Sequence, residues 1–181
     1  MHLPGKKIFL RSVLPQDAES LCQWENDKNN WKVSGTKKPF SKKEIKDFIV
    51  NQKDIYLDKQ FRLIICLAGI HPFSGSPIYE KKRRSGEVEK RSEVGCIDLF
   101  DFDEENRMAG IGILIDKKHR KNGFASEALS LLIVYSLETL NLHHLYCTIS
   151  TDNTSSLKLF RKHKFNITGK KKNICSLQLI N

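Results

Sequence analysis

Short apolar segments recur along the chain and predict β-strands. The segment from Phe61 to Ala68 is almost continuously apolar, rich in Ile and Leu, and bounded by Gly69. Such a run is too short for most helices and is typical of a buried strand. Segments of related character predict further strands over residues 8–13, 94–100, 107–116, 145–150 and 174–180.

Four other segments place apolar residues at helical spacing. The most apolar of them runs from Gly123 to Leu140 and predicts a long helix that is heavily buried. Ser41 and Glu44 form a capping-box pattern, which predicts the start of a helix that continues to about residue 52. Helices are also expected over residues 16–26 and 154–163.

The order of these elements is a strand, two helices, three strands, a long helix, a strand, a helix and a strand. This order predicts an α/β (α+β) fold in which a mixed sheet carries helices on both faces. A chain of 181 residues with 39% hydrophobic content fits one globular domain, residues 1–181. Residues 69–93 are polar, with a basic run at 81–84, and predict an exposed insertion between two strands.

Cysteine usage and hydropathy narrow the class of protein. The five cysteines include no C-x-x-C pair, so we expect neither a metal site nor a disulfide framework, as in a cytoplasmic protein. No segment approaches the ~20 apolar residues that span a bilayer, and residues 1–10 lack the apolar region of a signal peptide. The formal charge of +10 favours polyanions, among them nucleic acid, anionic membranes and phosphorylated cofactors.

The basic run Arg120-Lys121-Asn122-Gly123-Phe124-Ala125 lies between a predicted strand and the long helix. A helix N-terminus exposes backbone N–H groups and a partial positive charge, and Gly123 lets a pyrophosphate approach them. Arg120 and Lys121 add charge, and the small Ala125 leaves room in the first turn. The alternative is that Gly123 only turns the chain and that the basic residues are solvated.

This run resembles the R/Q-x-x-G-x-G/A signature of the GNAT acetyltransferase superfamily. Asn153, followed by Ser155-Ser156-Leu157-Lys158-Leu159-Phe160, resembles the family's N-x-x-[AS]-x-x-[LV]-[YF] segment. The resemblance covers roughly residues 6–170 and is densest from Val94 to Phe165, where the chain looks like the ribosomal-protein and polyamine acetyltransferase branch. It implies a single domain with a twisted, mostly antiparallel sheet of about six or seven strands and about four helices.

The resemblance also implies acetyl-CoA as co-substrate and a set of residues that contact it. In the family the strand before the loop pairs with pantetheine through its backbone, and the conserved Asn meets the pantetheine arm. Asn153 also suits a plain helix cap. The implied cofactor-binding residues are Ile113, Leu114, Ile115, Arg120, Lys121, Asn122, Gly123, Phe124, Ala125, Asn153 and Phe160.

This chain departs from the family at two positions where the family has proton-transfer groups. Phe160 stands where many members have a tyrosine that protonates the leaving thiolate, and a phenyl ring has no proton to donate. Gly110 stands near the position of a common glutamate base. Asp98 and Glu25 are therefore the candidate bases, although Asp98 also suits a strand end.

The acceptor side offers fewer signals. Trp24 and Trp31 are candidates for an acceptor pocket, although aromatic residues in and after a helix more often belong to a core. An acidic stretch could attract a cationic amine, or it could be a solvated hairpin loop. It comprises Asp98, Asp101, Asp103, Glu104 and Glu105. The segment Trp31–Pro39 lacks the carboxylates expected of a polyamine enzyme and favours an α-amine or an acidic peptide.

These features predict an acetyl-CoA-dependent N-acetyltransferase that acts directly on a primary amine, either a peptide or protein N-terminus or a small molecule. One alternative is a degenerate acetyl-CoA-binding module, which Phe160 and Lys164, at a position where the family usually has glycine, would favour. A nucleic-acid-binding protein would explain only the charge. We expect a cytoplasmic monomer or homodimer with no membrane, nucleic-acid or metal partner.

Overall fold

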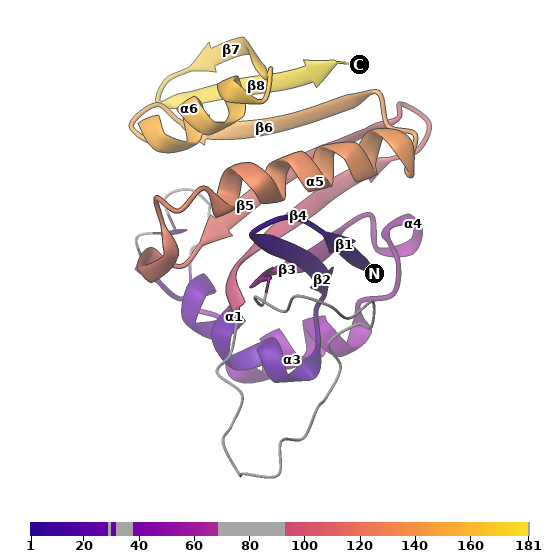
Figure 1. The fold of residues 1–181 in the computed structure, drawn as a ribbon, viewed down its shortest axis with the longest axis vertical. Coiled ribbons are helices and arrows are strands. Elements are labelled where there is room, and N and C mark those ends of the chain that lie inside the picture. The colour runs from indigo at the N-terminus through magenta and orange to yellow at the C-terminus, as the bar shows by residue number, and fades with distance from the viewer. Residues whose placement is uncertain (29, 32–37, 69–92, 181) are drawn as a thin grey trace.

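A single sheet of eight strands forms the centre of the molecule in the computed structural model, which describes residues 1–28, 30–31, 38–68 and 93–180. The strand order is β1-β2-β3-β4-β5-β6-β8-β7, and every neighbouring pair is antiparallel except β5 and β6 (Figure 1). The strands are β1 (His2–Pro4), β2 (Ile8–Ser12), β3 (Phe61–Leu67), β4 (Glu93–Asp103), β5 (Met108–Ile115), β6 (His144–Ser150), β7 (Asn166–Lys171) and β8 (Ile174–Ile180).

The mixed, mostly antiparallel sheet is confirmed, with slightly more strands than the six or seven expected. The added strands are β1 and β7. β1 has only three residues and ends at Pro4, and β7 is polar and almost entirely exposed. Neither segment therefore carries the apolar pattern that identifies a strand from sequence.

The described residues form five α-helices: α1 (Ala18–Glu25), α3 (Lys42–Asn51), α4 (Ile55–Asp58), α5 (Phe124–Glu138) and α6 (Thr154–Lys162). The capping box of α3 is present, because Ser41 Oγ accepts from Glu44 N at 3.1 Å and Ser41 N donates to Glu44 Oε2 at 2.7 Å. The four-residue α4 was not expected. Asp54 starts it by accepting from the backbone N–H groups of Tyr56 and Leu57.

Helices cover both faces of the sheet, as predicted. α5 and α6 pack on one face, over a core that includes Leu10, Ile97 and Ile111. α1 and α3 pack on the other face, over a core that includes Ile64 and Cys96.

No helix in the described part of the chain is both long and apolar enough to cross a membrane. Of the predicted insertion over residues 69–93, residues 69–92 lie outside the described residues and Glu93 begins β4.

The parallel strands β5 and β6 separate along their length. Met108, Ala109 and Gly110 pair with His144, Leu145 and Tyr146. Beyond Gly110, β5 continues to Ile115 in pairing with β4, while β6 continues to Ser150 in pairing with β8. The sheet therefore opens as a V whose apex lies at the Gly110–Tyr146 pair, and the edge of β5 that faces β6 has no strand partner from Ile111 to Ile115 among the described residues.

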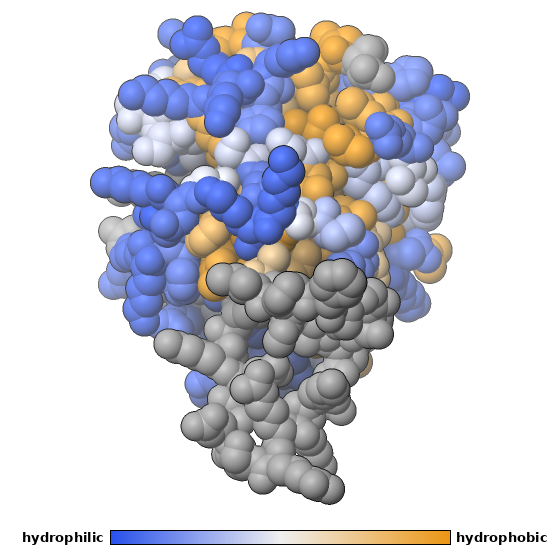
Figure 2. All heavy atoms as spheres, viewed as in Figure 1, coloured by the Kyte–Doolittle hydropathy of each residue, from blue (hydrophilic) through white to orange (hydrophobic). Residues whose placement is uncertain are grey.

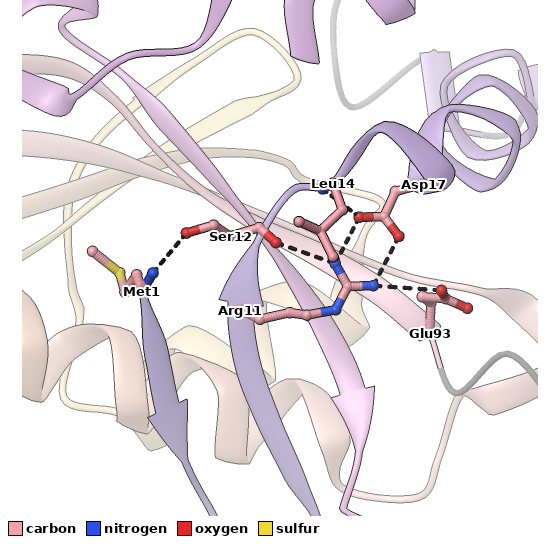
Figure 3. A network of polar contacts seen from close by, with 6 residues as sticks. All are labelled: Met1, Arg11, Ser12, Leu14, Asp17 and Glu93. Carbon is pink, nitrogen blue, oxygen red and sulfur yellow. Dashed lines mark hydrogen bonds and ion pairs between the residues drawn. The ribbon is translucent and has the colours of Figure 1, made fainter. Parts of the chain in front are cut away.

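A largely buried ion pair fixes the turn before α1 against the sheet (Figure 3). Arg11 donates to both carboxylate oxygens of Asp17, at 2.6 and 2.8 Å, and lies 3.4 Å from Glu93. Burial alone would lower the pKa of Arg11, but the hydrogen bonds and the charge of Asp17 outweigh burial. The pKa of Arg11 is therefore raised above its usual value, and the guanidinium stays charged. The contacts of Arg11 with Asp17 and Glu93 therefore join β2, the turn before α1 and the start of β4.

Candidate active site

The loop that leaves β5 ends at Gly123, the N-cap of α5. Gly123 has a φ of 84°, in the left-handed region that favours glycine, and a Cβ added there would meet nothing within 4 Å. The first intrahelical hydrogen bond runs from Glu127 N to Gly123 O, so the N–H groups of the first turn have no partner within the helix. At position 123 an anionic group can therefore approach these donors without meeting a side chain of that residue.

Two side chains of this loop, those of Arg120 and Asn122, are held by backbone carbonyls. Arg120 Nε donates to Ile115 O at 3.0 Å, which ties the loop to the end of β5. Asn122 Nδ2 donates to the carbonyls of His119 and Arg120 at 3.1 and 3.2 Å. In Figure 2, hydrophilic side chains crowd the side of this face where the loop and α6 lie. The loop thus combines a fixed backbone with an exposed positive surface.

The open edge of β5 extends from this loop toward the apex of the V. Ile113, Leu114 and Ile115 are all half-buried, and they pair with β4 through one edge only. Asn153 lies at the other side of the V, where its Oδ1 caps α6 by accepting from Ser156 N at 3.2 Å. The capping role of Asn153 is therefore present, and its amide N–H₂ is the part suited to meet a ligand.

Phe160 lies in the core beneath α6. Its side chain is 2% exposed and packs edge-to-face on Phe165, with ring centroids 5.0 Å apart. The same core contains Ile111, Cys147 and Ile149 from the two strands of the V. The V is consequently filled by apolar side chains on its α5–α6 side, and Phe160 presents almost no surface to a cofactor.

The opposite face of the apex has a floor of glycine. Gly110 pairs with both Phe100 of β4 and Tyr146 of β6. A Cβ at Gly110 would collide with the ring of Phe100, which in turn stands edge-on to Tyr146 with centroids 5.9 Å apart. The Phe100 ring therefore covers Gly110 and takes the space of the glutamate that the family resemblance implies there, whereas a Cβ at Gly112 would make only ordinary contacts with Asp98 and Phe100.

The two candidate bases meet at one arginine. Arg62 of β3 donates to both oxygens of Asp98, at 2.7 and 2.8 Å, and to Glu25 Oε1 at 2.6 Å. Its guanidinium also lies 5.5 Å from the ring centroid of Phe48. Burial acts to lower the pKa of Arg62, but the two carboxylates raise it well above its usual value. Arg62 is therefore a permanent cation that neutralises much of the charge of Asp98 and Glu25.

The two tryptophans predicted for an acceptor pocket have different surroundings. Trp24 is 6% exposed and belongs to the core under α1 and α3, and its Nε1 lies 3.4 Å from Asp116 Oδ2. Trp31 is half-buried and donates from Nε1 to Glu25 O at 2.8 Å. Of the two, only Trp31 therefore keeps part of its surface accessible, next to the backbone of Glu25.

Two residues of this region were not identified from the sequence. Arg62 could have been noticed, because a charged residue in the apolar run 61–68 requires a buried partner. Tyr146 carried no such signal, since an aromatic residue in an alternating strand is ordinary. Among the described residues no group of His, Cys, Asp and Glu side chains is arranged to hold a metal ion.

Comparison with known proteins agrees with this geometry. Residues 7–166 match the sequence model of the acetyltransferase (GNAT) domain. The uncharacterized N-acetyltransferase p20 of Bacillus licheniformis is 27% identical over 167 residues, which cover 91% of this chain and 82% of that protein. The spermidine N(1)-acetyltransferase of Vibrio cholerae serotype O1 is 27% identical over 90 residues, 49% of this chain and 52% of that protein.

A solved structure shows the same fold at low sequence identity. The spermidine N-acetyltransferase of Vibrio cholerae, in complex with CoA and spermine, aligns with a TM-score of 0.77 and 17% identity. The alignment covers 97% of this chain and 96% of that chain. At this identity the likeness establishes the arrangement of the elements.

Proposed function

The chain belongs to the GNAT acetyltransferase family, whose co-substrate is acetyl-CoA, and we propose that its acceptor is a primary amine, either a peptide or protein N-terminus or a small-molecule amine. The observation that carries this proposal is the V between β5 and β6. The N-terminus of α5, with Gly123 as its N-cap, lies at the open end of the V, and Gly110 lies at its apex. The co-substrate supplies the activated acetyl group. The remaining chemistry falls to the residues that line the V.

Each part of the V suits a different part of acetyl-CoA. The N–H groups that follow Gly123 suit the pyrophosphate, and Arg120 and Lys121 add positive charge beside them. The free edge of β5 at residues 113–115 suits the amides of the pantetheine arm, which would pair with it as an added strand. A backbone N–H of the same edge is also the expected donor to the carbonyl oxygen as it gains negative charge.

The acceptor amine must approach from the α1–α3 side of the sheet. The α5–α6 side of the V is filled by Phe160 and its neighbours in the core. On the α1–α3 side, Gly110 and Gly112 lack side chains, and Asp98 Oδ2 lies 3.6 Å from where a Cβ of Gly112 would be. At residues 110–112 an amine on this side therefore meets no side chain of β5 itself, and its neighbours there are Phe100 and Asp98 of β4.

The site has few groups suited to proton transfer. Asp98 and Glu25 remain the candidate bases, although both are ion-paired with Arg62. Phe160 cannot protonate a leaving thiolate. A thiol with a reference pKa of about 8.5 leaves tolerably without such help at neutral pH, so turnover does not require a tyrosine at this position.

Calorimetry with acetyl-CoA tests the cofactor assignment. We expect Gly123→Glu to weaken binding by about tenfold or more, because it places a negative charge beside the pyrophosphate. Gly123→Ala is the matched control, since it carries the same backbone strain at a φ of 84° without the charge. Equal affinity for acetyl-CoA in both variants would contradict the assignment.

Release of free CoA with a panel of amines tests the acceptor assignment. Acetyl-CoA binding together with CoA release for at least one primary amine is the expected result. Binding without release for any amine would favour the degenerate acetyl-CoA-binding module instead. The inference against polyamines rests on residues 31–39, of which 32–37 lie outside the described residues. The expected cytoplasmic location and the monomeric or homodimeric state remain predictions.

A further inference from the structure

A second carboxylate, Asp101, lies near the apex of the V. It follows Phe100 at a β-bulge, where the pairing of β4 with β5 shifts between Phe100 and Asp103. Its φ of 50° is in the left-handed region, which residues other than glycine adopt rarely, although Asn and Asp do so more readily than most. Bulges of this kind redirect side chains and are common beside active sites. The bulge turns Asp101 away from the position that regular pairing would give it.

Tyr146 holds Asp101 from two strands away. Tyr146 lies on β6 opposite Gly110, and its hydroxyl donates to Asp101 Oδ2 at 3.0 Å. Because β5 lies between β4 and β6, the side chains of Tyr146 and Asp101 meet across β5 near Gly110, which has no side chain and is covered by the ring of Phe100. Burial and the nearby carboxylate raise the pKa of Tyr146 to about 12, so the hydroxyl keeps its proton at neutral pH.

Asp101 differs from Asp98 in its charge balance. Arg62 occupies both oxygens of Asp98, whereas no described cation forms an ion pair with Asp101. The nearby Lys59 lies with its Nζ 5.8 Å from the ring centroid of Phe102, which belongs to the core on the α5 side of the sheet. Asp101 is exposed and keeps Oδ1 available for a further partner.

We infer that Asp101 binds the ammonium group of a cationic primary amine at the acceptor side of the V, and that Tyr146 is a positioning residue that aims this carboxylate. The inference rests on the proposed function and narrows its acceptor to amines that arrive as cations. Oδ1 receives the ammonium while the tyrosine hydroxyl holds Oδ2. Asp101 therefore supplies a carboxylate near the apex, where Phe100 leaves no room for one on Gly110.

Steady-state kinetics on the full chain tests the inference with three acceptors: spermidine, an alanine-initiated pentapeptide and n-butylamine. For each amine that reacts, we expect Asp101→Asn to raise KM by about tenfold, as for loss of one charge-assisted hydrogen bond, and to leave the affinity for acetyl-CoA unchanged. Glu104→Gln is the matched control, because it removes the same charge from the exposed turn three residues further on. We expect this control to leave KM unchanged.

Tyr146→Phe separates positioning from packing, since it keeps the ring against Phe100 and removes only the hydroxyl. We expect a smaller rise in KM for the amine, and a double variant with Asp101→Asn that is no worse than Asp101→Asn alone. Additive effects would overturn the positioning role of Tyr146. An unchanged KM in Asp101→Asn would overturn the inference while amine acetylation stands. If no amine reacts, the proposed acceptor class fails and the inference fails with it.

Discussion

Arg62 and Asp98 face each other across β3 and β4 and share two hydrogen bonds, of 2.7 and 2.8 Å. The third N–H direction of the guanidinium reaches Glu25 at the end of α1. One side chain therefore joins two strands and a helix at the acceptor side of the V. The guanidinium of Arg62 donates a hydrogen bond to each oxygen of Asp98. We therefore interpret Asp98 as a structural residue of the site as much as a candidate base.

Replacement of Arg62 by leucine should destabilise the protein strongly. Removal of one partner of a buried ion pair leaves uncompensated charge and typically costs about 3–5 kcal/mol. The cost here falls toward the lower end, because the side chains of Arg62, Glu25 and Asp98 keep 14–23% of their exposure. Urea unfolding measures the difference. Arg62→Lys keeps the charge but not the fork, and an equal stability of all three proteins would contradict this account.

A hydroxyl at position 160 should disturb the core. The ring of Phe160 is 2% exposed and lies edge-on to Phe165, so a tyrosine there would bury its hydroxyl without an obvious partner. A buried unpaired hydroxyl costs about 1–3 kcal/mol. We expect Phe160→Tyr to lower the thermal midpoint. Phe160→Leu is the control for lost ring volume alone, and a tyrosine variant as stable as the native protein would show that the hydroxyl finds a partner.

Much of the fold followed from apolar periodicity. The strands from Phe61, Val94 and Met108 are largely apolar runs, and the long helix after Gly123 has an apolar stripe. The elements that were missed have no such pattern. β7 is polar because it is the edge of the sheet, and α4 is a single turn held by the cap at Asp54. Edge strands and single turns are specified by their partners rather than by their own periodicity.

The site was less accessible from sequence than the fold. The loop from Arg120 to Ala125 was identified because its function requires local backbone geometry, which a glycine at a helix start reveals. The pairings of Arg62 with Glu25 and of Tyr146 with Asp101 join residues 37 and 45 positions apart. The first depends on how α1 packs on the sheet, and the second depends on strand register. Register depends on bulges such as the one after Phe100, which no local pattern predicts.

The departure at Lys164 from the usual glycine has a measurable consequence. Lys164 follows α6 with a φ of 66°, in the left-handed region that costs a non-glycine residue roughly 1 kcal/mol. Lys164→Gly should therefore raise the stability by up to about 1 kcal/mol, measured by urea unfolding. Lys158→Gly, inside α6, should lower it by about the same amount. A loss of stability in both variants would mean that the Lys164 side chain makes a contact that outweighs the strain.

His163 joins the two helices that flank the V. Its Nε2 lies 2.9 Å from Ser126 Oγ in the first turn of α5, and its Nδ1 lies 3.5 Å from Ser130 Oγ. Burial, and then the charge of Lys162, lower the pKa of His163 below its ordinary value of 6.5. The folded state therefore favours the neutral ring. This contribution to stability is complete above pH 6.5 and is lost as the pH falls through the lowered pKa.

Proton NMR titration of the His163 ring should give a pKa below 6.5, and Lys162→Gln should move it upward because one of the two causes is removed. His163→Gln keeps an amide that can bond to Ser126 but cannot gain a charge. We therefore expect this variant to lose less stability than the native protein between pH 7 and pH 5. If both proteins lose stability equally over that range, protonation of His163 is not what loosens the contact between α5 and α6.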